Sequence, residues 1–365
     1  MSPTDRNGNG AGTGGDAAPE VSFVIPVLNA AARLPACLGA IRRQQVPASR
    51  VEILVGDTGS TDASAAIARA HGARVLALPG LLAEPAKARL LREARGAFIA
   101  MLDADNEIAG EDWLARALAA LRRVPDALGF ESYTLKAPHH SRLNRHLTAN
   151  LHISDPLARS FARPPRRLGV DAEGVERFAL PADGCYPTGA NGFIFPRRLL
   201  DTVDARRPFH DASFLVPAMR AGCRTLLRIR GVGIYHHYVS GWADVFRKRE
   251  RILLIHLMER AAGRDAWDGP AWSGRKAAAL LLHATQVVPW IEGAWNALRR
   301  RDPDWLLHGP ASLVGLLGTA SGALAYLRLR TPDARRRYAR RIYGPAAAAV
   351  RGPAPPPHPR PRHRK

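Results

Sequence analysis

The sequence contains few cysteines, and their pattern excludes two common uses of that residue. Only Cys37, Cys185 and Cys223 occur in the 365 residues, at wide spacings and without a Cys-x-x-Cys pair. An odd number of dispersed cysteines argues against a disulfide framework and against a structural zinc site. The segment 1–19 has no apolar run, so we expect a disordered leader and no secretory signal. A reducing, cytoplasmic environment fits these features best.

Acidic residues are also scarce, because 53 Lys and Arg stand against 32 Asp and Glu and give a formal net charge of +21. The segment 328–365 alone holds twelve Lys and Arg and a single acid, Asp333. Such a segment attracts polyanions without sequence specificity. However, it follows two long apolar segments, 277–298 and 305–327, and basic clusters beside apolar segments suit an anionic membrane surface. We therefore expect a membrane surface as partner and no specific nucleic acid.

The two apolar segments allow several kinds of membrane contact. Segment 305–327 is long enough to cross a bilayer. A single span would export the basic tail, and a two-span hairpin would export the arginine triplet 299–301, although positive residues prefer the cytoplasmic side. Helices that lie in the interface or re-enter from the cytoplasm keep the basic tail and the arginine triplet on the cytoplasmic side. We expect such attachment at the cytoplasmic face of the cell membrane, with a true span or a soluble helical lobe as alternatives.

Short β-rich segments alternate with helical patterns in the first third of the chain. The predicted strands are 21–25, 51–55, 74–78 and 97–102, and the predicted helices are 31–44, 62–72, 84–96 and 111–123. Strands that alternate with helices in this way form right-handed crossovers and a parallel sheet. We therefore predict an α/β fold. Ligands of such sheets bind beyond the carboxyl ends of the strands.

Carboxylates follow two of these predicted strands. Asp57 lies in GDTGSTD, and Asp103 and Asp105 lie in DADNE. Carboxylate oxygens suit Mg²⁺ or Mn²⁺, and Mg²⁺ is typically held by one or two carboxylates together with substrate phosphates. The alternative is a loop of solvated acids in which Asp105 or Asn106 caps a turn. The pattern therefore favours a divalent cation site without excluding the simpler loop.

Four blocks, in this order, resemble those of the family 2 glycosyltransferases, an inverting group with the GT-A fold. They are IPVLN, DTGSTD, ARLLREARG and DAD, where the family has IPxxN, a DDGSTD-like run, ARNxGxxxARG and DxD. The resemblance covers residues 20 to about 240. It implies a GT-A, Rossmann-like, mostly parallel sheet flanked by helices, and a nucleotide-diphosphate sugar as donor. Thr58 and Leu90 depart from the family pattern, at its second Asp and at its Asn.

The resemblance also implies roles for single residues in these blocks. Pro26 and Asn29 would line the nucleotide pocket, and Asp57 would bind the base. Arg89 would lie near the nucleotide and phosphates, and Asp103 would approach the ribose.

The remaining roles concern the metal and the sugars. Asp105 would be the main protein ligand of Mg²⁺ or Mn²⁺. A late histidine of the family reaches the metal or the diphosphate. His236 and His237 both fit, and since adjacent strand residues point to opposite faces, at most one of them does so. We favour His236 as a second metal ligand, and an ordinary core or surface histidine is the alternative. The turn Gly189, Ala190 and Asn191 would lie near the acceptor and the donor sugar.

Asp211, in FHDASF, would be the catalytic base. His210 and Ser213 stand where the family has acids, so the alternative role of Asp211 is a helix N-cap.

We therefore expect a metal-dependent inverting glycosyltransferase of hexosyltransferase type, which acts on a lipid-linked or cell-envelope glycan acceptor. The alternative is a catalytically altered scaffold that binds a sugar nucleotide or a partner without transfer. The expected organisation is a leader (1–19), a GT-A domain (20–245), a helical, membrane-associated region (246–330) and a basic, disordered tail (331–365).

Overall fold

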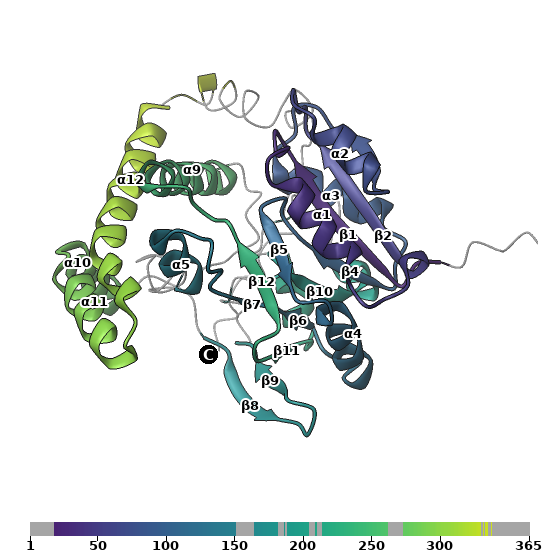
Figure 1. Cartoon of the computed structure of the whole chain (residues 1–365). Coiled ribbons are helices and arrows are strands. Elements are labelled where there is room, and N and C mark those ends of the chain that lie inside the picture. Colours follow the sequence, from purple (N-terminus) through teal and green to yellow (C-terminus); the bar gives the residue numbers. More distant parts are fainter. Residues whose placement is uncertain are drawn as a thin grey trace, which may run out of the picture.

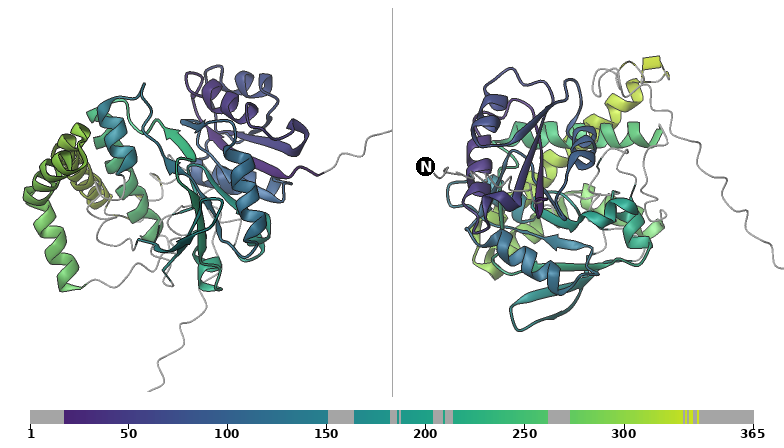
Figure 2. Two further views of the ribbon diagram at one scale, coloured as in Figure 1. Left: turned by 60° about the horizontal axis from the view of Figure 1, so that its bottom comes forward. Right: turned by 90° about the vertical axis from the view of Figure 1, so that its right-hand side faces the viewer.

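The computed structural model shows a sheet-containing lobe beside a lobe of helices (Figures 1 and 2). The described residues are 18–150, 164–181, 186, 188–203, 209, 214–261, 273–329, 331, 333, 334 and 337. The helical lobe begins with α9 (Trp242–Ala261). Because α9 is one continuous helix, the expected boundary at residue 245 falls inside it.

Nine strands form the main sheet among the described residues, in the order β3–β2–β1–β4–β10–β6–β11–β9–β8. Their bounds are β1 Val21–Val27, β2 Val51–Asp57, β3 Arg74–Ala77, β4 Phe98–Met101, β6 Gly129–Glu131, β8 Arg166–Val170, β9 Val175–Ala179, β10 Phe193–Pro196 and β11 Thr225–Ile229. β1 pairs in parallel with β2 and β4, and β2 pairs in parallel with β3. β10 runs antiparallel to β4 and β6. The predicted α/β fold with a parallel core is therefore confirmed.

A second, smaller sheet brings distant parts of the chain to the end of β4. Its order is β5–β12–β7, with β5 at Asn106–Ala109, β7 at Tyr133–Thr134 and β12 at Gly233–His236. β12 runs antiparallel to β5, with His236 opposite Asn106. β6 and β7 are separated by a single residue, yet they belong to different sheets.

Helices cover both faces of the main sheet. Every residue of β1 is buried, and successive residues of a strand point to opposite faces, so both faces must be covered. Phe23 and Ile25 belong to a core with α1 (Leu34–Arg42), α2 (Ser64–Ala70) and α4 (Trp113–Arg123). Val24 belongs to a second core, with α3 (Ala83–Glu93) and α8 (Val216–Arg220). Pro217 stands in the first turn of α8, where proline is tolerated.

The helical lobe is held together by an unusually close contact between two helices. It contains α9, α10 (Gly274–Ala284), α11 (Val287–Arg300), the short 3₁₀ helix η3 (Pro303–Leu307) and α12 (His308–Arg328). A Cβ on Gly318 would lie 2.5 Å from the backbone oxygen of Phe246, and one on Gly322 would lie 2.5 Å from that of Glu250. Gly318 and Gly322 therefore face α9 and let the two backbones meet.

This contact predicts different effects for two similar substitutions in α12. Gly318→Ala should lower the free energy of unfolding by about 1–3 kcal/mol, because its methyl group overlaps the backbone of α9. Gly315→Ala is the matched control, since its Cβ would lie 3.8 Å from the nearest atom, Arg249 Cγ, in ordinary contact. We expect that control to be neutral or slightly stabilising, because alanine favours helices. Thermal unfolding measures both, and equal melting temperatures would contradict this packing.

Candidate active site

The acids that follow β4 meet a buried lysine of α3. Lys87 Nζ lies 2.6 Å from Asp103 Oδ1, and the whole Lys87 residue is only 6% exposed. A buried ammonium needs a partner of opposite charge, and Asp103 supplies it. The Cys37 thiol lies beneath, 3.8 Å from the backbone oxygen of Asp103. The end of β4 is thus a paired, partly buried site and not a loop of solvated acids.

The structure does not bring Arg89 to this site. Residues 87 and 89 lie about 200° apart around a helix, so they face opposite ways. Arg89 is exposed and pairs with Glu93 one turn later, with 3.3 Å between Nη2 and Oε1. The family pattern ARNxGxxxARG explains the shift. When its last three residues are placed on Ala94–Gly96, its first arginine falls on Lys87. We therefore propose Lys87, and not Arg89, as the residue on the phosphate side.

The sequence contained a signal for Lys87. The buried positions of α3 include Lys87, Leu90 and Leu91, spaced three and four residues apart. A lysine within such an apolar stripe is unusual, and it indicates a buried charge with a partner.

The late histidine lies beside the second acid of the DAD turn. His236 Nε2 is 3.6 Å from Asp105 Oδ1, and the backbone amide of His237 donates to the backbone oxygen of Asp105 at 2.9 Å. Burial raises the pKa of the Asp105 carboxyl, but the nearby His236, Lys248 and Lys87 outweigh burial and hold that pKa below its usual value. Asp105 is therefore a carboxylate at neutral pH.

These groups fit a divalent cation that is shared with a ligand. Asp105 and His236 direct an oxygen and a nitrogen toward each other. No group of three or more His, Cys, Asp or Glu in the described part of the chain could hold a metal ion by itself. Mg²⁺ usually takes only one or two carboxylates and completes its shell with water and substrate phosphates. The donors present suit that arrangement, and Asp103 is already paired with Lys87.

The loops after β1 and β2 are bound to each other. Asn29, in a left-handed conformation (φ 49°), accepts from the backbone amide of Thr61 at 2.8 Å. Asp57 ends β2, and its Oδ1 accepts from the backbone amides of Gly59 and Ser60. Pro26 is buried within β1. Asn29 and Asp57 thus shape the two loops, and the second oxygen of Asp57 has no hydrogen-bond partner in the part of the chain that the structure describes.

The turn at residues 189–192 reaches the same edge from the far side. The backbone amide of Gly192 donates to the backbone oxygen of Met101, the last residue of β4, at 2.8 Å. Gly189, Asn191 and Gly192 all have positive φ, whereas Ala190 between them does not. The side-chain oxygen of Asn191 is buried and has no hydrogen-bond partner among the described residues. A buried, unpaired acceptor beside the acids suggests a ligand that donates a hydrogen bond.

The predicted base, Asp211, lies outside the described residues, as do His210 and Ser213.

Residues 22–154 match the family model described as Glycosyl transferase family 2. The matched segment includes Asn29, Asp57, Lys87, Asp103 and Asp105. Over this part of the chain, the match agrees with the predicted family and enzyme class.

Further similarities extend beyond the family 2 domain. Glycosyltransferase AglE of Haloferax volcanii is 26% identical over 238 residues, which cover 52% of this chain and 78% of that protein. A mannosyltransferase of Pyrobaculum calidifontis, solved with GDP-Man and Mn²⁺, is 16% identical over 91% of this chain and 86% of that one, with a TM-score of 0.46. Glucosyl-3-phosphoglycerate synthase of Mycobacterium tuberculosis is 18% identical over 65% and 78%, with a TM-score of 0.43.

Two cationic residues on α3 provide a matched test of the site. Lys87→Ala should weaken the binding of UDP or GDP about tenfold or more, because a buried cation is lost and the unpaired Asp103 then repels a diphosphate. Arg89→Ala should change that affinity by less than about twofold, because exposed helical ion pairs contribute little. Calorimetric titration of both variants measures this, and the reverse order of effects would return the role to Arg89.

Proposed function

We propose that this protein transfers a hexose from a nucleotide-diphosphate sugar to a hydroxyl of a lipid-linked or cell-envelope glycan, with inversion, at the cytoplasmic surface of the membrane. The observation that carries the proposal is the meeting of Asp105 and His236 beside the Asp103–Lys87 pair, at the carboxyl edge of a family 2 domain.

The charges at this edge suit a leaving diphosphate. Asp105 and His236 would hold Mg²⁺ or Mn²⁺, which neutralises phosphate charge when it is bound. Lys87 and Lys248 both lie near Asp105 and add positive charge to the same place. Burial lowers the pKa of Lys248, and the nearby Asp105 opposes that change. The partly buried location of these groups strengthens their attraction to an anion.

The sugar and the acceptor hydroxyl would lie against the turn at 189–192. The unpaired oxygen of Asn191 can accept a hydrogen bond from a hydroxyl of the sugar. From the sequence resemblance we propose Asp211 as the base that takes the proton of the acceptor hydroxyl. A single displacement at the anomeric carbon, with the leaving group on the opposite side, inverts the configuration.

Substitution of single carboxylates tests this mechanism. Asp105→Asn and Asp211→Asn should each lower kcat by about a hundredfold or more, because one loses a charge at the diphosphate and the other loses the base. Glu107→Gln is the matched control, since Glu107 stands two residues after Asp105 but pairs only weakly with Arg43, at 4.0 Å. Nucleotide release from UDP-, GDP- and dTDP-sugars, with Mg²⁺ or Mn²⁺ and with or without lipid extract, measures the rate and identifies the donor. Near-normal rates in both variants would overturn the mechanism.

The proposed membrane contact rests on the helical lobe, where large apolar side chains are exposed and small residues are buried. In α12, small residues face α9 and large apolar residues face outward. The exposed residues define an apolar face on three helices: Leu281 and Leu282 on α10, Trp290, Ile291, Trp295 and Leu298 on α11, and Leu313, Leu317, Leu324 and Leu327 on α12. Soluble monomers rarely expose so many large apolar residues together.

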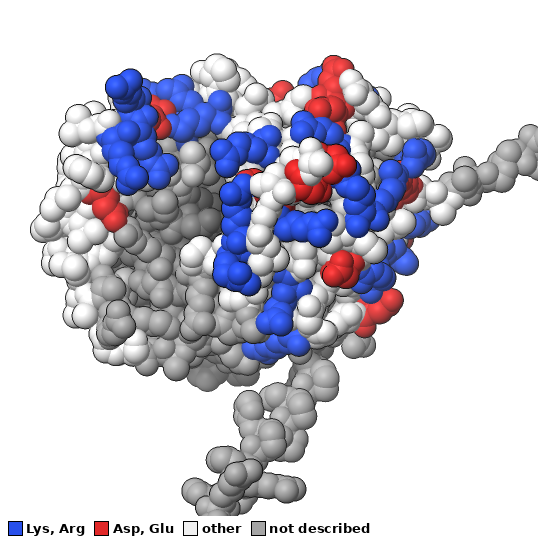
Figure 3. Space-filling model, turned by 90° about the horizontal axis from the view of Figure 1, so that it is seen from below, with Lys and Arg blue, Asp and Glu red and all other residues white. Residues whose placement is uncertain are grey.

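Positive charge borders the apolar face. Arg299, Arg300 and Arg301 follow directly on Leu298, which is 78% exposed. Viewed from below, the outer rim of the helical lobe is largely uncharged, and a cluster of lysine and arginine lies directly beside it (Figure 3). Exposed tryptophans with neighbouring arginines suit the interface of an anionic bilayer.

The packing of α12 favours interfacial attachment over a span. The segment Pro303–Arg328 has the length and mean hydropathy, 1.3, of a membrane-crossing helix. However, its glycines contact the backbone of α9, which carries the charged run Arg247–Arg251 at the contact. A span would take these charges into the hydrocarbon, at a cost of several kcal/mol. We therefore propose that the apolar face lies in the interface and that α12 stays beside α9.

Vesicle binding tests this attachment. The double variant Trp290→Ser with Trp295→Ser should bind vesicles of phosphatidylcholine and phosphatidylglycerol about tenfold more weakly, because two interfacial anchors are lost. Leu168→Ser with Val170→Ser is the control, since these residues are exposed on β8, away from the helical lobe. Co-sedimentation and release by carbonate are the measurements. Equal binding of both double variants, or retention of the protein until detergent is added, would contradict interfacial attachment.

A further inference from the structure

The short helix α5 (Arg142–Ala149) lies between the small sheet and the helical lobe (Figure 1). Ser141 caps it by accepting from the backbone amide of Asn144. Its apolar side belongs to a small core in which Leu143 and Leu147 pack with Val239 and with Val245 and Ala311 of the helical lobe. α5 therefore contacts the chain that leaves β12 on one side and α9 and α12 on the other.

The side chain of Asn144 binds the backbone on both sides of a short stretch after β12. Asn144 is fully buried. Its amide nitrogen donates to the backbone oxygen of His236 at 2.9 Å, and its oxygen accepts from the backbone amide of Val239 at 2.8 Å. A side-chain amide with this double contact satisfies two backbone groups where β12 has lost its strand partner. It fixes the path of residues 236–239.

That path sets the position of the groups at the candidate metal site. Within it, the His236 ring lies 3.6 Å from Asp105, and the His237 amide donates to the Asp105 backbone. The Asn144 side chain lies behind this layer. Among the described residues it bonds the backbone of His236 and of Val239 and the His140 ring, the last at 2.9 Å. Its influence on the site therefore passes through His236.

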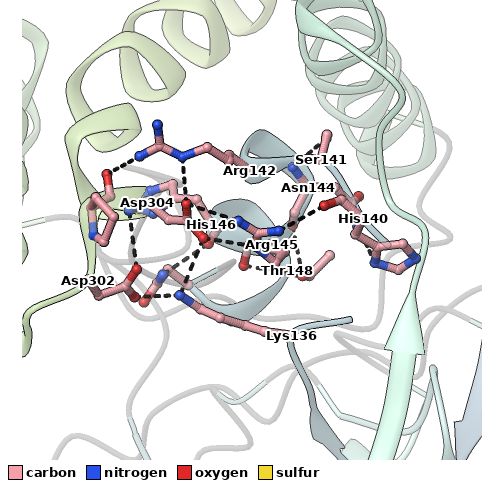
Figure 4. A network of polar contacts seen from close by, with 12 residues as sticks. Lys136, His140, Ser141, Arg142, Asn144, Arg145, His146, Thr148, Asp302 and Asp304 are labelled. Atoms are coloured by element: carbon pink, nitrogen blue, oxygen red, sulfur yellow. Dashed lines mark hydrogen bonds and ion pairs between the residues drawn. The ribbon is translucent and has the colours of Figure 1, made fainter. Parts of the chain in front are cut away.

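The outward side of α5 is held by an acid of the helical lobe (Figure 4). Asp304 is 4% exposed, and its two oxygens accept from Arg142 Nε at 2.9 Å and from Arg145 Nε at 3.0 Å. Lys136 lies 3.7 Å from Asp304 and also pairs with Asp302. We call these five residues the Asp304 clasp.

The clasp is strong enough to hold α5 in place. Burial raises the pKa of the Asp304 carboxyl, but the hydrogen bonds from Arg145 and Arg142 outweigh burial and hold the pKa below its usual value. Asp304 is therefore ionised and paired at neutral pH. Asp304 is the buried partner, so removal of its arginines would leave a buried carboxylate without compensation, which is strongly destabilising. The ring of His146 adds a second contact, with Nε2 3.3 Å from His308 Nδ1.

We propose that α5 is a positioning helix for the metal site: Asn144 sets the backbone of residues 236–239, and the Asp304 clasp sets α5. The inference rests on the proposed function, because it takes His236 as a ligand of the divalent cation. It assigns a role to Asn144 and to the Asp304 clasp, which act on the site through the backbone of residues 236–239. Partners that orient a metal-binding histidine typically change metal affinity about 10–100-fold when they are removed.

Direct Mn²⁺ titration tests the inference without an activity assay. Mn²⁺ binding to the full chain, with UDP or GDP present, is followed by electron paramagnetic resonance. Asn144→Ala should weaken Mn²⁺ about tenfold. Asn150→Ala is the matched control. Asn150 is a buried asparagine at the other end of α5, and among the described residues its side-chain amide donates to the His146 backbone within the helix. We expect the control to lower the melting temperature without a change in Mn²⁺ affinity.

A double-variant cycle separates positioning from general loosening of the fold. If Asn144 acts through His236, Asn144→Ala should weaken Mn²⁺ in the wild-type background but have no further effect in the His236→Ala background. Asp304→Asn should act in the same direction, with a smaller change. Equal effects of Asn144→Ala in both backgrounds, or equal effects of Asn144→Ala and Asn150→Ala, would overturn the inference. If His236→Ala itself leaves Mn²⁺ affinity unchanged, the proposed metal site fails instead.

Discussion

The position of β4 between a parallel and an antiparallel neighbour is the constraint on which the site depends. Met101, its last residue, is paired with Val24 of β1 on one side and with Phe193 of β10 on the other. Both registers are fixed because each strand is buried on both faces, and a slip by one residue would exchange its two faces. The loop with the two acids and the turn at 189–192 must therefore leave the sheet at the same point. The proposed metal site and the proposed sugar-binding turn are neighbours because both segments leave the sheet at the end of β4.

Much of this arrangement could be predicted from local patterns. The alternation of strands and helices identifies the parallel core, and the rule for ligand sites in such sheets identifies Asp103 and Asp105. The buried positions of α3 also include Lys87. However, the family pattern ARNxGxxxARG has eleven positions and the matched stretch ARLLREARG has nine, so the phosphate-side role was predicted for Arg89. In the structure Lys87 faces Asp103 and Arg89 does not, because positions two residues apart lie on nearly opposite sides of a helix. The sequence spacing therefore identified the helix, but it did not identify which of its two cationic residues faces the acids.

Other features could not be predicted, because they depend on contacts between distant segments. α5 is only eight residues long and stands among proline, arginine and histidine, so its period is too short to recognise. The partners of Asn144 lie more than ninety residues away, and Asp304 lies about 160 residues from Arg142 and Arg145. A buried asparagine has the same local pattern whether it binds its own helix, as Asn150 does, or another segment.

The Asp304 clasp also bears on whether the two lobes can exist apart. A fragment that ends near residue 245 would contain the whole family 2 segment, and by sequence it resembles an independent domain. It would nevertheless leave Arg142 and Arg145 without their carboxylate and uncover Leu147, which is 1% exposed in the full chain. Such a fragment would keep Lys87, Asp105 and His236, but it would lose Lys248 and the support behind α5. In this molecule the helical lobe is therefore structural material of the catalytic domain and not a removable anchor.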